Sequence, residues 1–403
     1  MSKVAVMGYG TVGSGVVEVL TTNAQSISMR AGEEVEVKYV LDLRDFPGSP
    51  VENKLVKDFN VIVNDAEVDI VVETMGGLHP AYEFVKASLE AGKSVCTSNK
   101  ELVAAYGAEL LEIARDNNIN FLFEASVGGG IPIIRPLKSS LTADEIEEIT
   151  GILNGTTNYI LTKMRDNGSA FEEVLKEAQE LGYAERNPEA DVEGYDACRK
   201  IAILTSLAYG KQVDFEDIYT EGITAITAED FLYAKAIGTT IKLVGTSKIV
   251  NGKVVAMVAP VLISADSPLY SVDDVFNGIY VRGNMLGDVM FYGKGAGKLP
   301  TASAVVADVV EAVKHKGTNI MTIWSKDKQE LVDFSEAAHR FFVRINNSEG
   351  IAEKVEKLFG AVKTIDIGIA DEYAFVTDEM TESAFADKQA EVSGVISRIR
   401  FAD

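Results

Sequence analysis

The chain opens with Lys3-Val4-Ala5-Val6-Met7-Gly8-Tyr9-Gly10-Thr11-Val12-Gly13, and this stretch decides the fold of its first part. An apolar strand pattern ends at Gly8, and a helical pattern follows the glycines. Gly8 permits a tight turn, Gly10 lets the backbone approach a pyrophosphate, and Gly13 lets helix and strand pack closely. Free N–H groups at the helix start would hold the anion. We therefore expect a dinucleotide on Gly8, Gly10, Thr11, Val12 and Gly13; a strand–helix turn with incidental glycines is the plainer alternative.

Short β-rich runs and helical runs alternate over the first 130 residues. Strand-like runs cover residues 4–7, 34–41, 69–72, 94–97 and 119–124, helical runs cover 12–24, 80–91 and 102–117, and residues 61–63 form a further apolar run. Such alternation predicts a parallel sheet with helices on both faces. With the glycine turn, it indicates an α/β fold with a Rossmann-type doubly wound sheet.

The end of the second strand bears on the form of the cofactor. Asp42 could accept hydrogen bonds from an adenosine ribose, which favours NAD, whereas Arg44 could neutralise a 2′-phosphate, which favours NADP. Asp42 lies further from the glycines than the usual spacing of about 20 residues. A solvated loop charge is an equally good interpretation of Asp42, so the choice between NAD and NADP stays open.

Composition narrows the class of protein. The 403 residues include 61 acidic and 38 basic side chains, which give a formal net charge of -23. Such a surface repels phosphate backbones, so nucleic acid is not an expected partner. Cys96 and Cys198 lack disulfide-type or metal-type spacing, which favours a reducing cytoplasm. No apolar run reaches the roughly 18 residues of a membrane span, so we expect a cytoplasmic protein without a membrane partner.

Ser98 and Lys100 follow the strand at residues 94–97. Ligands of open α/β sheets bind at the carboxyl ends of the strands, so both residues are expected to reach the cofactor. A lysine is mildly unfavourable in the first turn of a helix, which favours a functional role for Lys100. The plain alternative is that Ser98 or Asn99 caps a helix and Lys100 is a surface charge.

The segment 182–200 carries the strongest chemical signal. Asp196 and Lys200 are four residues apart, so they share one face of a helix. Such pairs are usually solvated salt bridges. Here the helix continues as Ile201-Ala202-Ile203-Leu204, which is apolar almost all round and therefore buried. A buried acid–lysine pair after an acidic loop with Glu185 and Asp191 indicates a polar pocket.

Three further segments invite two interpretations each. The hydroxyl of Thr156, in Asn154-Gly155-Thr156-Thr157, could bind a carboxylate or serve a helix cap. The carbonyls of residues 124–131, which contain Gly128-Gly129-Gly130, could ligate a cation, although a plain domain hinge is the better explanation from the residues alone. Residues 292–297 form a glycine-rich loop that could close over a ligand.

The pattern of elements predicts three domains. Residues 1–130 form the dinucleotide-binding domain, and residues 131–325 form an α+β domain for substrate, catalysis and dimerisation. A helix near residues 301–316 is expected to return to the first domain. Residues 335–403 follow a β-α-β-β-α-β order, which is typical of a small ferredoxin-like module.

The chain resembles the homoserine dehydrogenase family over nearly its whole length. The motifs that carry the resemblance are GYGTVGSGV from Gly8, SNKELVA from Ser98, FEASVGGGIPIIRPL from Phe123, GILNGTTNYILTKM from Gly151, ELGYAERNPEADVEGYDACRKIAIL from Glu180 and MFYGKGAGKLPTASAVV from Met290. The family reduces L-aspartate 4-semialdehyde to L-homoserine with NADH or NADPH, in threonine and methionine biosynthesis. The resemblance also implies a homodimer or homotetramer.

The resemblance assigns roles to individual residues. It implies Lys200 as the proton donor, Lys100 as a second catalytic lysine, and Glu185 and Asp196 as ligands of the amino acid, with Asp191 in support. It places Gly182 and Gly297 on the cofactor, and it implies a sodium ion held by main-chain oxygens of Glu124, Val127, Gly129 and Ile131. The chemistry agrees, because hydride delivery to an aldehyde leaves an alkoxide that needs an acid. The three histidines, His79, His315 and His339, do not lie beside an obvious nucleophile.

Two departures from the family pattern matter. Members often have a basic residue before the aspartate of the second strand, where this chain has Leu41, although Arg44 and Lys57 could compensate. The tail is similar to the ACT regulatory module, but residues 346–350 read Asn-Asn-Ser-Glu-Gly where such modules often have Asp-x-Pro-Gly. Whether the tail binds threonine or another effector is therefore open.

Two other functions compete with this interpretation. One is a dehydrogenase of another amino-acid aldehyde or ketone, which an assay on homoserine would separate. The other is a non-catalytic nucleotide sensor with the tail as its output. The sensor has no need for two lysines among carboxylates, so Lys100 and Lys200 argue against it.

Overall fold

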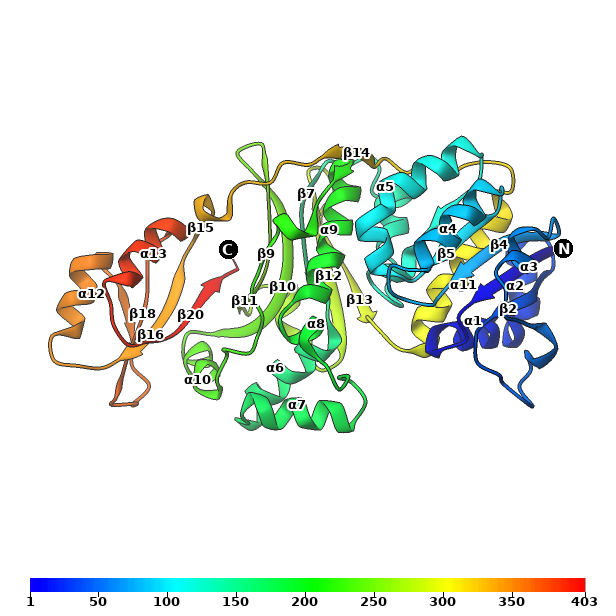
Figure 1. The fold of residues 1–403 in the computed structure, drawn as a ribbon. Coiled ribbons are helices and arrows are strands. Elements are labelled where there is room, and N and C mark those ends of the chain that lie inside the picture. The colour runs from blue at the N-terminus through cyan, green and yellow to red at the C-terminus, as the bar shows by residue number, and fades with distance from the viewer. Residues whose placement is uncertain (403) are drawn as a thin grey trace. The chain divides into compact units, whose positions relative to one another are not determined.

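The computed structural model describes residues 1–402 (Figure 1). The chain forms two compact units. Unit 1 contains Met1–Ile146, Ala202–Phe215 and Phe291–Gln329, and unit 2 contains Glu147–Ile201, Glu216–Met290 and the chain from Glu330 onward. Over the described residues, none of the helices combines the length and the apolar character that crossing a lipid bilayer requires.

Unit 1 is built on a parallel six-stranded sheet with the order β3-β2-β1-β4-β5-β6. This is the strand order of a doubly wound dinucleotide-binding sheet, so the Rossmann-type prediction is confirmed. The strands are β1 (Ser2–Met7), β2 (Val35–Leu41), β3 (Leu55–Val56), β4 (Val68–Glu73), β5 (Ser94–Thr97) and β6 (Phe121–Leu122). The helices that precede unit 2 in the chain are α1 (Thr11–Thr22), α2 (Ala24–Ala31), α3 (Asn60–Val63), α4 (Ala81–Glu90) and α5 (Lys100–Asp116).

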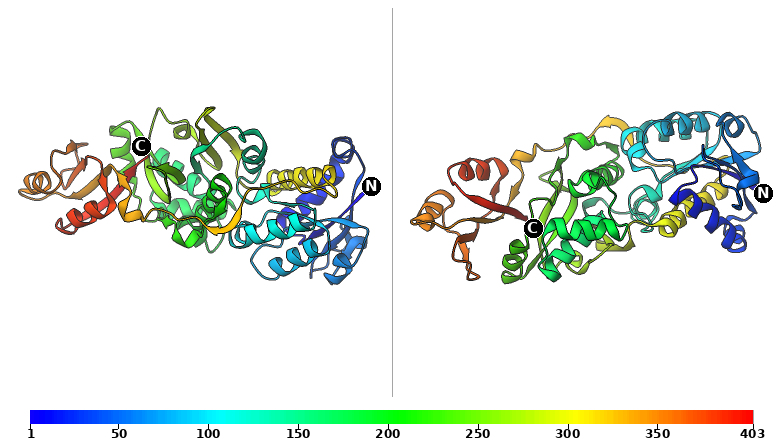
Figure 2. Two further views of the ribbon diagram at one scale, coloured as in Figure 1. Left: turned by 90° about the horizontal axis from the view of Figure 1, so that it is seen from above. Right: turned by 60° about the horizontal axis from the view of Figure 1, so that its bottom comes forward.

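A late helix, α11 (Lys298–Lys314), also belongs to unit 1. It lies beside α1 in all three views (Figures 1 and 2). The approach is close because α1 presents glycine, since a Cβ on Gly15 would lie 2.9 Å from the Lys298 carbonyl oxygen. Val16 of α1 and Val305 of α11 are both fully buried in the same apolar core. A short pair, β8 (Lys211–Gln212) and β14 (Ser325–Lys328), completes unit 1.

Unit 2 is organised around a mixed sheet with the order β13-β12-β7-β10-β11-β20-β16-β18-β17. Its centre is a hairpin of two twelve-residue strands, β10 (Thr239–Val250) and β11 (Lys253–Ser264). Beside it lie β7 (Ile146–Ile152), β12 (Phe276–Gly283) and β13 (Gly287–Lys294), and β9 (Tyr219–Thr220) pairs with β11. The helices are α6 (Gly155–Asn167), α7 (Phe171–Glu180), α8 (Glu189–Val192) and α10 (Ala228–Ala236), while α9 (Tyr195–Tyr209) begins in unit 2.

The C-terminal part of unit 2 has a ferredoxin-like topology. Its strands pair in the order β20-β16-β18-β17, with antiparallel neighbours throughout. Phe341 and Phe375 are fully buried at its centre. The elements are β16 (Phe341–Asn346), α12 (Ile351–Phe359), β17 (Lys363–Ile365), β18 (Glu372–Val376), α13 (Glu382–Ala390) and β20 (Val395–Phe401), with a short pair β15 (Ala338–His339) and β19 (Met380–Thr381).

In several short segments the secondary structure differs from what the sequence pattern indicates. The apolar run at residues 61–63 is helix α3. Residues 278–292 have a sequence typical of a strand, and the structure forms the hairpin of β12 and β13 there, which turns at Asn284, Met285 and Leu286. Residues 133–140 have a helical sequence pattern, but the structure forms a π-helical turn there, Pro136–Ser140. The long strand β10 is not apparent in the sequence because it carries polar residues on both faces, among them the buried Lys242.

Candidate functional site

The glycine turn is shaped by steric limits that only glycine meets. Gly8 has a positive φ of 90°, and a Cβ on Gly13 would lie 1.9 Å from the Gly8 carbonyl oxygen. By contrast, a Cβ on Gly10 would meet no atom within 4 Å. Gly10 is also the N-cap of α1, and it has no side chain to cap the N–H groups of the helix start at Thr11 and Val12. The turn thus presents backbone donors to open space, the arrangement that suits a pyrophosphate.

Asp42 lies against this turn. Its Oδ2 accepts the backbone N–H of Tyr9 at 2.8 Å, and its Oδ1 accepts Nε of Arg44 at 3.0 Å. The hydrogen bond from the Arg44 side chain is the largest influence that holds the pKa of Asp42 well below its ordinary value. Lys57 is turned to other partners, because its Nζ lies 2.8 Å from Asp45 and 3.0 Å from the Leu43 carbonyl. The structure therefore brings Asp42 and Arg44 together beside the glycine turn as one pair.

Residues 73–77 also contact the glycine turn, and sequence reasoning missed them. The Thr74 hydroxyl donates to the carbonyls of Met7 and Gly8, both at 3.0 Å. Glu73, which is fully buried, accepts the N–H groups of Met75 at 2.7 Å and Gly76 at 3.2 Å. The signal was present as Glu73-Thr74-Met75-Gly76-Gly77 directly after a buried strand. We refer to Gly8–Gly13, Asp42–Arg44 and Glu73–Gly77 together as the glycine edge.

The glycine edge is tied to the start of α5, where Ser98 and Lys100 lie. The Thr97 hydroxyl donates to Glu73 at 2.5 Å and accepts the N–H of Asn99 at 2.9 Å. Asn99 Nδ2 donates to the Gly77 carbonyl at 2.7 Å, and its Oδ1 caps α5 by accepting the N–H of Leu102. Burial raises the pKa of Glu73, and the hydrogen bonds that it accepts from Thr97, Met75 and Gly76 oppose the rise. Lys100 is the first residue of α5 and is half-buried.

In unit 2, a polar cluster joins the end of β7 to the start of α9. Asn154 Nδ2 donates to Asp191 at 2.7 Å and to Asp196 at 2.8 Å, while Lys200 Nζ donates to Asp196 at 2.7 Å and to the Leu153 carbonyl at 2.8 Å. Asp196 is 3% exposed and Lys200 is 8% exposed. We call these five residues the Asn154 cluster. The sequence predicts Asp191, Asp196 and Lys200 as site residues, but it does not indicate a role for Asn154.

Local structure explains why these side chains converge. The Asn154 Oδ1 accepts the N–H of Thr157, so Asn154 is the N-cap of α6 and its amide nitrogen points away from the helix. The first half of α9 packs on the sheet, since a Cβ on Gly245 of β10 would lie 3.1 Å from Ile201 Cβ. Lys200, one residue earlier, is therefore held at the sheet with Asp196 one turn before it.

Gly182 and Glu185 lie on the loop before α8, and Thr156 of α6 contacts this loop. Thr156 donates its hydroxyl to the Tyr183 carbonyl at 2.7 Å. Gly182 is exposed with a positive φ of 76°. Glu185 is exposed too, and its carbonyl accepts Nε2 of Gln179 at 3.1 Å. Thr156 is thus connected with this loop, whereas the side chain of Glu185 is exposed to solvent.

The glycine-rich bend at residues 124–131 is buried in unit 1 except at Gly130. A Cβ on Gly128 would lie 2.4 Å from the Ile131 carbonyl oxygen, and one on Gly129 would lie 2.2 Å from the Gly295 carbonyl oxygen. Main-chain oxygens are therefore packed at the inside of a cradle that any Cβ would fill. Hard cations prefer such oxygen donors, so the main-chain oxygens proposed from the sequence fit a cation. Over the described residues, no group of three or more His, Cys, Asp or Glu could hold a metal ion.

Glu124 stiffens this bend with its side chain. Its carboxylate accepts the N–H groups of Ile133, Ile134 and Arg135 at 2.6, 2.8 and 2.7 Å. Asp308 of α11 accepts the Glu124 N–H at 2.8 Å and the Arg135 guanidinium at 2.6 Å. Burial, and then the charge of Glu124, raise the pKa of Asp308 to about 7. In the same region Gly297 is the N-cap of α11, with a positive φ of 117°.

Comparisons with known proteins agree with these features. A family model described as homoserine dehydrogenase, NAD binding domain, matches residues 8–124, and one described as homoserine dehydrogenase matches residues 132–310. The homoserine dehydrogenase of Synechocystis sp. is 40% identical over 100% of this chain and 94% of its own length.

Solved structures are similar as well. The structure of a homoserine dehydrogenase from Thiobacillus denitrificans has a TM-score of 0.92 at 36% identity, and the match covers 100% of this chain and 98% of that chain. A hyperthermophilic archaeal homoserine dehydrogenase in complex with NADPH has a TM-score of 0.66 at 30% identity, and the match covers 77% of this chain and 97% of that chain.

Proposed function

The chain belongs to the homoserine dehydrogenase family, and we propose that Lys200 donates the proton in the reaction that this NAD(P)-dependent oxidoreductase catalyses. The single observation that carries the proposal is the Asn154 cluster. An 8% exposed lysine lies 2.7 Å from an aspartate that is itself held by an asparagine at 2.8 Å. A buried lysine held in one position is suited to proton transfer at a defined atom.

The chemistry follows from the reaction, the interconversion of L-aspartate 4-semialdehyde and L-homoserine. The bound nicotinamide supplies a hydride to the aldehyde carbon. The aldehyde oxygen gains negative charge as this happens, and Lys200 donates a proton to that oxygen. Lys100 acts as a second cation that stabilises the developing charge. In the reverse direction Lys200 takes the proton from the hydroxyl of homoserine.

Carboxylates would bind the ammonium group of the amino acid. Asp196 and Glu185 are the proposed ligands, and Asp191 supports them through Asn154. The loop that carries Glu185 must bring its side chain inward for this contact. Thr156, which fastens the same loop at Tyr183, is proposed to bind the substrate carboxylate.

The glycine edge is proposed to bind the cofactor. The N–H groups at Thr11 and Val12 would hold the pyrophosphate, and the Asp42–Arg44 pair would meet the adenosine ribose. Arg44 is the cation that a 2′-phosphate would use, because it pairs with Asp42 beside the glycine turn, whereas Lys57 pairs with Asp45. The remaining proposed cofactor contacts are Gly8, Gly10, Gly13, Ser98, Lys100, Gly182 and Gly297.

Three further proposals concern a bound ion, the oligomeric state and the C-terminal module. Main-chain oxygens of Glu124, Val127, Gly129 and Ile131 would hold a sodium ion, whose charge would stiffen the bend. A homodimer would form through the face of the unit 2 sheet that bears Thr246. That face is opposite to the one on which α9 packs at Gly245, and a hollow of about 320 Å³ lies on it. The ferredoxin-like tail would be an ACT-like regulatory module.

The assignment of Lys200 is tested by turnover and cofactor binding measured on the same variant. We expect Lys200→Ala to lower the rate of homoserine oxidation by about a thousandfold, with NAD and with NADP. NADPH affinity, measured by fluorescence, should change by less than about twofold. The control is Lys163→Ala, which removes a lysine of α6 that pairs with Asp274 at 2.9 Å. Normal turnover in Lys200→Ala would refute the assignment, and a wild-type protein that binds cofactor without turnover would be a sensor.

A further inference from the structure

The strand β20 belongs to the sheet of unit 2 on which α9 packs. One edge of β11 pairs with β10 along its whole length. The other edge pairs with β9 at Met257 and Val258, and with β20 at Val261 and Leu262. The strands β9 and β20 therefore follow one another along the same edge of β11, and side chains from both meet where they adjoin.

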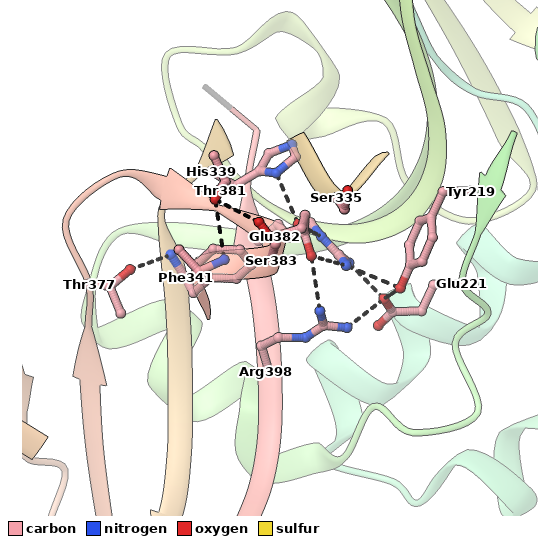
Figure 3. Close-up of polar contacts among 12 residues, drawn as sticks. Tyr219, Glu221, Ser335, His339, Phe341, Thr377, Thr381, Glu382, Ser383 and Arg398 are labelled. Carbon is pink, nitrogen blue, oxygen red and sulfur yellow. Dashed lines mark hydrogen bonds and ion pairs between the residues drawn. The ribbon is translucent and has the colours of Figure 1, made fainter. Parts of the chain in front are cut away.

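A buried group of charges lies at this meeting point (Figure 3). Arg400 of β20 is fully buried, and its guanidinium donates to Glu221 at 2.6 Å and to Glu382 at 2.5 Å. Arg398 donates to the same Glu221 oxygen at 2.8 Å. Tyr219 of β9 accepts Nη2 of Arg400 through its hydroxyl at 3.1 Å. Glu221 is thus the residue through which two arginines of the C-terminal strand hold the segment after β9.

The charges keep Glu221 ionised although it is partly buried. Burial would raise its pKa, but the charges of Arg400 and Arg398 outweigh burial and leave the pKa of Glu221 below its ordinary value. Removing the charge would leave two arginine side chains without this counter-charge. Arg400 could not relax into water, because it is fully buried.

The segment that Glu221 holds is packed directly on the substrate turn, which we define as residues 191–194. Ile223 donates its N–H to the Val192 carbonyl at 2.8 Å. A Cβ on Gly222 would lie 2.3 Å from that same carbonyl oxygen, and a Cβ on Gly194 would lie 3.2 Å from Thr220 Cγ2. The two backbones touch with no side chain between them, so a shift of one must move the other.

The substrate turn carries Asp191 at its start and leads into Asp196, whose partner is Lys200. We propose that Glu221 is a positioning residue for the reaction. Clamped by Arg398 and Arg400, it fixes the turn that places the carboxylates of the Asn154 cluster around the substrate ammonium. The inference rests on the proposed function, because it assumes that these carboxylates hold the amino acid. It also links the C-terminal module to the site through Glu221 and the segment that packs on the substrate turn.

The test compares two glutamates that arginines hold at the same module. Glu221→Gln removes the charge that faces the substrate turn. Glu372→Gln removes a partner of Arg344, whose guanidinium lies 2.7 Å from Glu372 and 2.6 Å from Asp230 of α10. Both variants weaken an arginine network of the C-terminal module, but the contacts of Arg344 lead to α10 and not to residues 191–194. KM for homoserine, kcat, NADPH affinity and Tm are measured for each full-length variant.

We expect Glu221→Gln to raise KM for homoserine about tenfold, with kcat lowered less than about threefold and NADPH affinity unchanged within about twofold. Arg398→Gln should raise KM in the same direction by a smaller factor, because Arg400 still holds Glu221. Glu372→Gln should lower Tm comparably and leave KM unchanged. Adding Arg398→Gln to Glu221→Gln should raise KM little further, since the two residues act as a unit.

Two results would overturn the inference. One is a wild-type KM in Glu221→Gln, and the other is an equal rise of KM in Glu372→Gln, which would mean that general weakening of the module is responsible. Failure of the proposed function looks different, because it appears as normal turnover in Lys200→Ala. A Glu221→Gln enzyme with normal KM beside an inactive Lys200→Ala enzyme would therefore refute only the positioning role.

Discussion

The glycine edge and the Asn154 cluster solve the problem of holding a ligand with different parts of the chain. The glycine edge uses backbone, since Gly13 is confined by the Gly8 carbonyl and Gly10 faces open space. The Asn154 cluster uses side chains from the end of β7, from α8 and from α9, all within hydrogen-bond distance. A site made of backbone fails when a side chain is added, whereas a site made of side chains fails when one is removed.

The largest expected effect on stability comes from adding a methyl group to the glycine edge. In Gly13→Ala the new Cβ would lie 1.9 Å from the Gly8 carbonyl oxygen, so the strand and helix must separate. We expect a loss of about 3 kcal/mol in unfolding free energy and a loss of about a hundredfold in NADPH affinity. Urea unfolding and fluorescence titration measure the two effects.

Gly10→Ala is the matched control for this change. Its Cβ would meet no protein atom within 4 Å, so the unfolding free energy should stay within about 0.5 kcal/mol of the wild type. Cofactor affinity should still fall, because the methyl group would occupy the space proposed for the pyrophosphate. Equal destabilisation of the two variants would contradict the steric account.

The next effect is a dependence of stability on pH that arises from two neighbouring carboxyl groups of unit 1, Glu124 and Asp308. The folded pKa of Asp308, about 7, lies above its unfolded value of 3.8. The folded state therefore binds the proton more tightly, and the stability that this gives is present below pH 4 and is lost as the pH rises through 7. Between pH 5 and pH 8 the loss is on the order of 2–3 kcal/mol.

Asp308→Asn removes this titration. The variant should be less stable at every pH, because an amide has one acceptor oxygen for the two donors that Asp308 holds, the Glu124 N–H and the Arg135 guanidinium. The fall in stability between pH 5 and pH 8 should be smaller, because the titrating group is gone. Urea unfolding at four pH values measures the slope, and Asp288→Asn, which alters an exposed pair with Arg282, serves as control. An unchanged slope in Asp308→Asn would assign the titration to another group.

A smaller effect is expected from removing one side chain of the Asn154 cluster. Asn154→Ala deletes the amide that joins Asp191 to Asp196 and the cap of α6. We expect kcat/KM for homoserine to fall about thirtyfold. Thr381→Ala provides the comparison, because it removes the cap of α13 and no ligand of the proposed site. A similar fall in both variants would mean that the loss of a helix cap is enough to explain the result.

The smallest expected effect concerns the cofactor. Arg44 is largely exposed, with 62% of its side chain accessible, and it pairs with Asp42. Arg44→Ala should lower kcat/KM for NADPH about fivefold and change that for NADH by less than about twofold, because only NADPH carries a 2′-phosphate. Initial rates with both cofactors decide the point, and Lys54→Ala is a nearby control. A larger loss with NADH would place Arg44 elsewhere on the cofactor.

The same contrast explains what the sequence could predict. The glycine turn was identified because its constraint is local, with strand, spacing and helix all within Lys3–Gly13. The pair of Asp196 and Lys200 was found for a similar reason, since helix periodicity places both on one face. The Rossmann-type sheet and the order of the last elements followed from alternation and length.

What was missed depends on contacts across long stretches of chain. Asn154 meets Asp191 and Asp196 across about forty residues, and no local pattern records that meeting. Glu73 was overlooked because an acid at the end of a buried strand resembles a solvated turn until Thr97 is placed beside it. The strand β10 escaped notice because Lys242, which pairs with Asp273 at 2.8 Å, breaks its apolar pattern.

The shared edge of β11 has a consequence for anyone who shortens this enzyme. Removing the chain after β15 would delete β20 and uncover the peptide groups of Val261 and Leu262, which now pair with Arg400 and Phe401. An uncovered strand edge is a template for strands of other molecules, so the shortened protein would tend to aggregate. It would also leave Glu221 without its arginines. A useful truncation must therefore supply a replacement strand, or charged residues that block the edge.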